Sequence, residues 1–235
     1  MNKRKWYLKK RMGLMIFIAL FFLGGRMEFA KFRYDPAQLA QTILQHGQLQ
    51  PVFGTKNKDG KTIQFLKIGN RPDLPLVVFV HGSPGALNAY ESYLSDTILS
   101  QKADLLAIDR MGFGYSDFGE TESSLITQSA MIAMVLEDFP QQKKILVGHS
   151  MGGPVIARLA VDYPDLVDGL VMVAPSISPQ LEPSNTWRRV MDFCLICWMT
   201  PPALRVCNQE IIPLQGELEQ LVRDWKCLEI PVTVV

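Results

Sequence analysis

A chain of 235 residues is long enough for one α/β domain with a fully buried core. Hydrophobic residues make up 48% of the chain and charged residues 20%, which excludes a globally disordered protein. The formal net charge of +1 gives no support for a nucleic-acid partner.

Basic and apolar residues are separated at the N-terminus. Six of the 24 basic residues precede the apolar run 12–25, and the first acidic residue is Glu28. This order is typical of a secretory signal or a short N-terminal anchor, although a buried helix is an alternative. As a helix the run would span only about 21 Å of a hydrocarbon core of about 30 Å, which favours a signal. We expect residues 1–25 to be a signal-like or membrane-anchor segment, so that the domain is exported or anchored in the cytoplasmic membrane on its extracytoplasmic side.

Residues 26–50 resemble a polar, partly helical linker, and an α/β pattern follows over residues 51–175. Short apolar runs alternate there with helical patterns, which is typical of a mainly parallel sheet covered by helices. The last four apolar runs are continuous, as in strands buried on both faces. The predicted strands are 52–55, 62–68, 76–80, 105–108, 145–147 and 170–173, and the predicted helices are 88–100, 123–139 and 152–163.

The alternation ends after Pro175. Residues 176–229 predict two or three helices, one of them with Leu218, Leu221, Val222 and Trp225 at the spacing of one helical face. Residues 230–235 predict one more strand.

All four cysteines lie in this later part of the chain. Buried thiols and disulfides both stay open, and the Cys-x-x-Cys spacing lacks the second pair or nearby histidine of a zinc site. No metal or other cofactor is expected. The cysteines are Cys194, Cys197, Cys207 and Cys227.

Residues 148–152, GHSMG, lie between a predicted strand and a predicted helix. A turn this tight needs small residues such as Gly148 and Gly152 beside Ser150, because larger side chains would collide with neighbouring elements. The turn exposes the Ser150 hydroxyl and directs a helix N-terminus at it, which favours developing negative charge. The motif predicts a nucleophilic serine, and a glycine-rich turn without chemistry is the alternative.

Residues 81–85, HGSPG, follow the predicted strand 76–80. Such a tight loop at Gly82 can direct a backbone amide toward the nucleophile. The Ser83 and Met151 amides are the candidate oxyanion-hole donors, and we expect His81 to hold the loop through hydrogen bonds.

Residues 109–117, DRMGFGYSD, follow the predicted strand 105–108, and we expect Asp109 to fix this loop. In their order and spacing, HGSPG, DRMGFGYSD and GHSMGG resemble the α/β-hydrolase superfamily, in its branch of single-domain hydrolases with a helical cap. The similarity covers about residues 50–235, with Met111 where related sequences often carry proline. It implies an eight-stranded sheet, Ser150 after the fifth strand, and a helical lid that would be residues 176–229.

The resemblance also implies a triad acid after the seventh strand and a histidine after the eighth, and residues 230–235 match the seventh. We expect His46 to be a surface residue, His81 to serve the loop, and His149 to point away from Ser150. Residues 174–180 contain no acid, and Glu182 already lies at the edge of the lid. We therefore expect the triad acid and histidine to be absent, and the sequence to be C-terminally truncated, lacking the eighth strand and last helix.

A serine nucleophile implies hydrolysis of a small ester, thioester or amide through an acyl-serine intermediate. It argues against dehalogenase or epoxide-hydrolase chemistry, whose enzymes in this superfamily carry aspartate at the position of Ser150. Without a base this form is expected to be inactive or barely active. A non-catalytic binding or scaffold module that keeps the pocket is the alternative, and a membrane-anchored interaction domain is a third hypothesis. The expected partners are a small ester or amide substrate and, through the N-terminal segment, a membrane.

Overall fold

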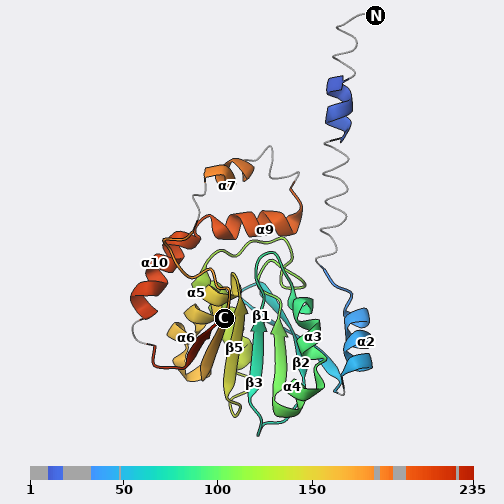
Figure 1. The fold of residues 1–235 in the computed structure, drawn as a ribbon, viewed down its shortest axis with the longest axis vertical. Coiled ribbons are helices and arrows are strands. Elements are labelled where there is room, and N and C mark those ends of the chain that lie inside the picture. The colour runs from blue at the N-terminus through green and yellow to red at the C-terminus, as the bar shows by residue number, and fades with distance from the viewer. Residues whose placement is uncertain (1–9, 18–32, 48, 183–185, 193–199, 226–227) are drawn as a thin grey trace, which may run out of the picture.

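A computed structural model of the chain describes residues 10–17, 33–47, 49–182, 186–192, 200–225 and 228–235 (Figure 1). Their strands form one seven-stranded sheet in the order β1-β2-β4-β3-β5-β6-β7. The β1–β2 and β2–β4 pairs are antiparallel and the other pairs are parallel. The predicted mainly parallel α/β sheet is confirmed. The strands are β1 (Pro51–Lys58), β2 (Lys61–Ile68), β3 (Leu76–Val80), β4 (Asp104–Ile108), β5 (Lys144–His149), β6 (Gly169–Val173) and β7 (Val232–Val234).

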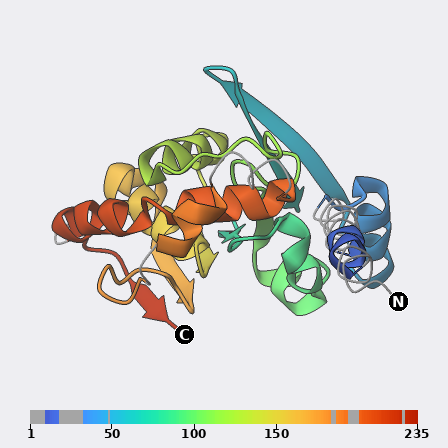
Figure 2. The same ribbon diagram turned by 90° about the horizontal axis from the view of Figure 1, so that it is seen from above.

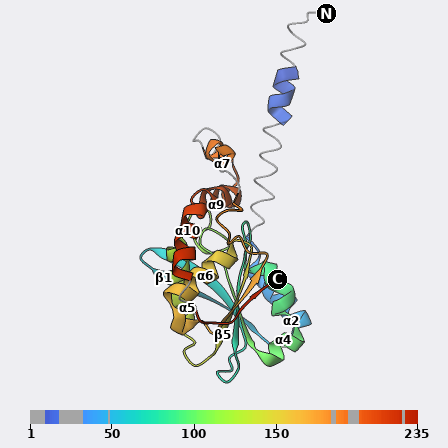
Figure 3. The same cartoon turned by 60° about the vertical axis from the view of Figure 1, so that its left-hand side comes forward.

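Helices cover both faces of the sheet (Figure 3). On one face, α5 (Leu125–Leu136) and α6 (Gly152–Asp162) pack on alternate strand residues such as Val78 and Leu146, and α10 (Leu214–Asp224) packs on α6. On the other face, a second core includes Phe79 and Leu105. Since successive strand residues point to opposite faces, continuous apolar runs fill both cores. The second core is covered by α2 (Pro36–His46), a 3-10 turn η2 (Leu87–Tyr90), α3 (Glu91–Leu94) and α4 (Thr97–Lys102).

Helix α2 lies within the segment predicted as a partly helical linker, and it packs into the second core. Asp35 caps its N-terminus by accepting hydrogen bonds from the amides of Ala37 and Gln38, and Gly47 follows its last residue. Leu39 and Ile43, four residues apart on one helical face, are buried.

The single helix predicted over residues 88–100 is wrong. The structure has η2, α3 and α4 there, with a break at residues 95–96. Asp96 adopts an extended conformation, and its carboxylate accepts hydrogen bonds from the amides of Ile98 and Leu99. Because aspartate caps a new helix in this way, it ends the continuous helical pattern.

Among the described residues of the predicted lid, three helices form, α7 (Thr186–Met191), α9 (Pro202–Ile211) and α10. Seen from above, α9 runs across the end of the sheet from which the β3, β4 and β5 loops emerge, and α10 lies beside the sheet next to α6 (Figure 2). On α10, Leu218 and Leu221 are buried, as their spacing predicted, whereas Val222 is exposed. The division of the chain into a core and a lid stays a prediction, and residues 193–199 lie outside the described part.

The expected N-terminal membrane anchor, and with it the expected export or anchoring of the domain, is corrected by the structure. Residues 10–17 form a short helix, and the rest of the run 12–25 lies outside the described residues. Within the described ranges, every helix is too short or too polar to cross a bilayer.

We expect Ile43→Ala to lower the free energy of unfolding by about 2–5 kcal/mol, because it leaves a cavity in the second core. Leu44→Ala on the same helix should change it by less than about 1 kcal/mol, since Leu44 is largely exposed. Urea denaturation of the two variants measures both changes. Equal effects would show that α2 does not stabilise the domain.

Candidate active site

Ser150 lies at a sharp turn, because β5 ends at His149 and α6 begins at Gly152. Its φ of +50° is in the left-handed region, which costs a non-glycine residue on the order of 1–2 kcal/mol. Three backbone hydrogen bonds hold this conformation. The Ser150 amide donates to the Val173 carbonyl at 3.0 Å, and the Ser150 carbonyl accepts from Gly153 at 3.0 Å and from Ser176 at 3.1 Å. Strain that is held so firmly is typical of functional sites.

The glycines around Ser150 permit this turn. A Cβ atom on Gly148 would lie 2.6 Å from the Gly152 carbonyl oxygen, and one on Gly152 would overlap the Val80 carbonyl oxygen of β3. A Cβ on Gly153 would lie 2.6 Å from Cβ of Pro175. Helix α6 therefore packs directly on the strand ends, as the motif predicted.

The loop after β3 lies directly against Ser150. A Cβ atom on Gly82 would be 3.0 Å from Cβ of Ser150, so the peptide that joins Gly82 to Ser83 runs beside the serine. Met151 immediately precedes α6, where backbone amides have no partner within the helix. Neither the Ser83 amide nor the Met151 amide donates a hydrogen bond to another residue that the structure describes. Both amides are thus available to an oxygen bound near Ser150.

His81 holds this loop with both ring nitrogens. Nδ1–H donates to the Gly82 carbonyl at 2.7 Å, and Nε2 accepts a hydrogen bond from the Arg110 amide at 2.9 Å. Burial, reinforced by the nearby Arg110 charge, lowers the pKa of His81 to about 3. The ring is therefore neutral at physiological pH and has no free nitrogen with which to accept a proton from Ser150.

Asp109 holds the next loop. Its buried carboxylate accepts hydrogen bonds from the Leu87 amide at 2.7 Å, the Tyr115 amide at 2.9 Å and the Tyr34 hydroxyl at 3.0 Å. Burial nevertheless raises the pKa of Asp109 to about 6. These partners come from three separate segments, so Asp109 joins these segments, and the loop-fixing role expected of it stays a prediction.

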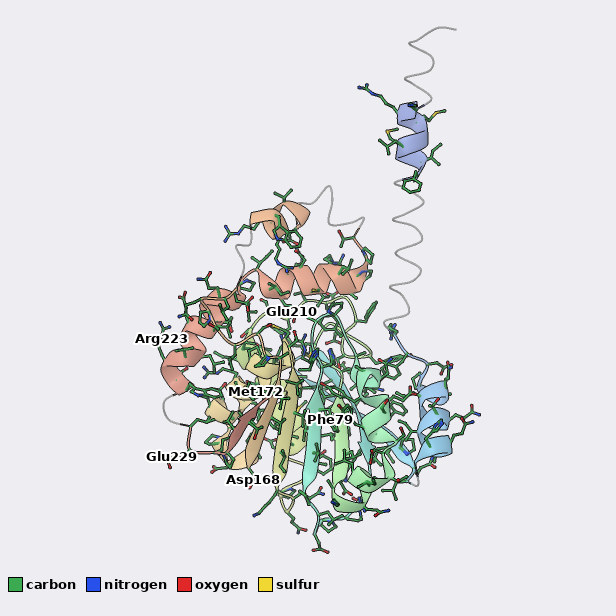
Figure 4. The ribbon with its side chains drawn as sticks, in the orientation of Figure 1. Phe79, Asp168, Met172, Glu210, Arg223 and Glu229 are labelled. Carbon is green, nitrogen blue, oxygen red and sulfur yellow. The ribbon has the colours of Figure 1, made fainter. Side chains whose placement is uncertain are left out.

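The sequence analysis missed a buried ion pair that joins these loops to α9. The Arg110 guanidinium donates to both carboxylate oxygens of Glu210 on α9, at 2.9 and 3.1 Å, and both side chains are fully buried. Figure 4 shows Glu210 on the side of α9 that faces the sheet. A signal existed, because Ala203, Val206 and Glu210 share one helical face and the first two are apolar. A carboxylate on such a face requires a buried partner.

Ser150 opens into a cavity of about 640 Å³ that follows one face of the sheet. Ser83 lines it too, and the Ser83 hydroxyl lies beside the Cys207 thiol of α9 without a hydrogen bond of ordinary geometry. His149 also lines it and is exposed, and the expectation that His149 points away from Ser150 stays a prediction. Its side chain follows the alternation of β5 onto the cavity face. Much of the remaining wall is apolar or aromatic and consists of Val77, Phe79, Tyr90, Tyr93, Leu99, Val147, Val171 and Val173.

Three of the remaining candidates, His46, Glu182 and Cys207, do not line this cavity, and the other cysteines lie outside the described residues. His46 is exposed at the end of α2, where its Nδ1 pairs with the Thr42 carbonyl oxygen. Glu182 is half-buried, and burial raises its pKa. Cys207 is a free thiol, whereas Cys194, Cys197 and Cys227 lie outside the described residues.

We expect Gly152→Ala to lower the free energy of unfolding by about 3 kcal/mol, because its Cβ would overlap the Val80 carbonyl oxygen. Gly216→Ala on α10 is the matched control. Its Cβ would meet open space, so it should raise stability by about 0.5–1 kcal/mol. Urea denaturation compares them, and a neutral Gly152→Ala would show that α6 is not so close to β3.

The raised pKa of Asp109 predicts a pH dependence of stability. Since the folded protein binds this proton more tightly than the unfolded chain does, the carboxyl's contribution to the free energy of unfolding falls as pH rises from about 4 to about 6. Asp109→Asn removes the titration. The free energy of unfolding of the variant, relative to that of wild type, should therefore rise by up to about 3 kcal/mol between pH 4 and pH 7. Denaturation at both pH values tests this, and a constant difference would contradict it.

Comparisons with known proteins agree with this geometry. Residues 75–194 match the family described as "alpha/beta hydrolase fold". The chain is 33% identical over 139 residues to Esterase Rv0045c of Mycobacterium tuberculosis, an alignment that covers 58% of this chain and 44% of the esterase. It is 33% identical over 129 residues to the non-heme chloroperoxidase of Streptomyces lividans, with 54% of this chain and 46% of that protein covered.

Among solved structures, Cfl2 of Burkholderia cenocepacia superimposes with a TM-score of 0.62 and 20% identity. That match covers 86% of this chain and 81% of Cfl2, and at this identity it shows the fold alone. The chain spans less than half the length of the esterase and of the chloroperoxidase. Because the family match includes more than half of the chain together with the loops around Ser150, this protein belongs to the α/β-hydrolase family.

Proposed function

We propose that this chain carries the nucleophile and oxyanion hole of a serine hydrolase that acts on a small ester, thioester or amide. The observation that carries the proposal is the strained Ser150 beside two unengaged amides at the mouth of a cavity. The name of the mycobacterial relative, an esterase, supports the reaction class.

In this proposal the Ser150 hydroxyl oxygen attacks the carbonyl carbon of the substrate while its proton passes to a base. The carbonyl oxygen becomes negatively charged and accepts hydrogen bonds from the Ser83 and Met151 amides, which are fixed in advance on either side of the turn. When the tetrahedral intermediate collapses, the alcohol, thiol or amine leaves with a proton and the acyl group stays on Ser150. Water then hydrolyses the acyl-serine and restores the enzyme.

We further propose that the base is not one of the three histidines of this sequence. His46 is exposed on α2, and His81 uses both nitrogens within the loop. His149 lines the cavity but makes no hydrogen bond with Ser150 in the described structure. Acylation by this chain alone should therefore be slow, limited to roughly 10³–10⁴-fold over water.

The cavity suits a small apolar group beside the reacting carbonyl. Its wall next to Ser150 includes Val147, Val173 and Phe79, with few polar groups to recognise a charged substrate. The same cavity would also serve the alternative, a non-catalytic module that binds a ligand without turnover, and the lack of a placed histidine base favours that alternative.

A fluorophosphonate probe tests the proposal. Wild-type protein should be labelled slowly but stoichiometrically at Ser150, as located by mass spectrometry, and Ser150→Ala should abolish the labelling. Ser178→Ala, which removes a hydroxyl that bonds only to Gln180 among the described residues, should be labelled like wild type. Folded wild-type protein that stays unlabelled would refute the hydrolase and leave the binding module.

A further inference from the structure

We propose that Glu210, acting through Arg110, makes the cap helix α9 a positioning element for the Ser83 amide. The inference rests on the proposed role of that amide in an oxyanion hole. It assigns to α9 a part in the catalytic geometry.

Arg110 uses every donor of its guanidinium. Nε donates to the His81 carbonyl at 2.8 Å, and one Nη donates to Gln128 Oε1 at 2.7 Å and to Glu210 Oε2 at 2.9 Å. The other Nη donates to Glu210 Oε1 at 3.1 Å and to the Gly82 carbonyl at 3.3 Å. Since a guanidinium has five N–H groups, the side chain is saturated, and only this fork geometry fits its partners.

Two of these partners belong to the loop beside Ser150, and they determine the direction of the Ser83 amide. The Gly82 carbonyl accepts hydrogen bonds from His81 Nδ1–H and from Arg110. In a planar trans peptide the N–H of the next residue points opposite to the carbonyl. Holding the Gly82 carbonyl on the Arg110 side therefore directs the Ser83 N–H to the opposite side of the peptide.

Glu210 is the link between this loop and the cap. Other contacts attach α9 to the loop after β4, such as Arg205 Nη2 to the Gly119 carbonyl at 3.1 Å and Thr121 Oγ1 to Gln209 at 2.6 Å. Among the described residues of α9, only Glu210 bonds to the guanidinium that holds the His81 and Gly82 carbonyls. The position of α9 is thereby coupled to the loop.

The chemistry of the pair favours a positioning role over a purely stabilising one. Removing two charges from water costs several kcal/mol per ion, so a buried ion pair contributes little net stability compared with apolar residues of the same volume. What a bidentate pair supplies is a fixed direction and distance. Here that direction is transmitted to the peptide next to Ser150.

Hydrogen exchange of the folded chain tests the coupling. Glu210→Gln keeps the shape of the side chain but turns one acceptor into a donor that faces Arg110. Amides of residues 80–87 should then exchange about tenfold faster or more, together with those of residues 202–211. The matched control is Glu217→Gln on α10, whose carboxylate accepts from the Leu125 amide at the start of α5, and it should leave exchange of residues 80–87 unchanged.

Faster exchange in α9 with unchanged exchange in residues 80–87 would overturn the proposal. If Glu210→Gln does not fold, the wild-type chain can still be used to test the coupling between α9 and the loop. In low concentrations of urea, the amides of residues 80–87 and 202–211 should exchange through one common opening, so their exchange rates should depend on urea concentration in the same way. Exchange rates with different urea dependences would refute the coupling.

Fluorophosphonate labelling in the same samples separates this inference from the proposed function. If wild type is labelled, Glu210→Gln should slow labelling at Ser150 about tenfold or more, whereas Glu217→Gln should not. Labelling unchanged by Glu210→Gln would refute the positioning role. If wild type is not labelled, the proposed function fails, and the exchange result still decides whether α9 positions the loop.

Discussion

The reversal of the chain between β5 and α6 is the constraint on which the site depends. Two residues carry the backbone from a buried strand into a buried helix, so one of them, Ser150, adopts a left-handed conformation. The helix can follow only because Gly148 and Gly152 leave room for neighbouring carbonyl groups. A hydrogen bond from the Ser150 amide to the Val173 carbonyl, and one from the Ser176 amide to the Ser150 carbonyl, then place β6 and its loop next to the serine. The position of Ser150 at the cavity is thus a consequence of close packing below it.

The loops around Ser150 hold one another through buried polar groups. His81 bonds to the loop after β4, Asp109 bonds to the segment after β3 and to Tyr34 before α2, and Arg110 bonds to three elements. Each of these side chains would be costly to bury without partners, and each has them. The site is therefore formed by a network in which no loop is independent, and this rigidity is what preorganised amides require.

The sequence predicted most of what depends on local pattern. Continuous apolar runs located β3, β4 and β6 to within one residue at each end and β5 to within two, since a strand buried on both faces has no polar positions to interrupt the run. The turn at Ser150 was predictable because its glycines stand at positions where a larger side chain would collide with neighbouring elements. The break within the predicted helix 88–100 was not predictable from periodicity, because the carboxylate of Asp96 caps a new helix despite the apolar pattern around it. The bond between Arg110 and Glu210 escaped prediction because its partners are 100 residues apart, and a local window contains only one of the two charges.

That separation has a consequence for how the chain is made. A ribosome releases the polypeptide from its N-terminus, so Arg110 emerges 100 residues ahead of the carboxylate that neutralises it. Until residue 210 has been synthesised, the guanidinium lacks this counter-charge, and burial of an unpaired charge is costly. Burial of Arg110 between the loops after β3 and β4 is therefore favoured only once α9 is present.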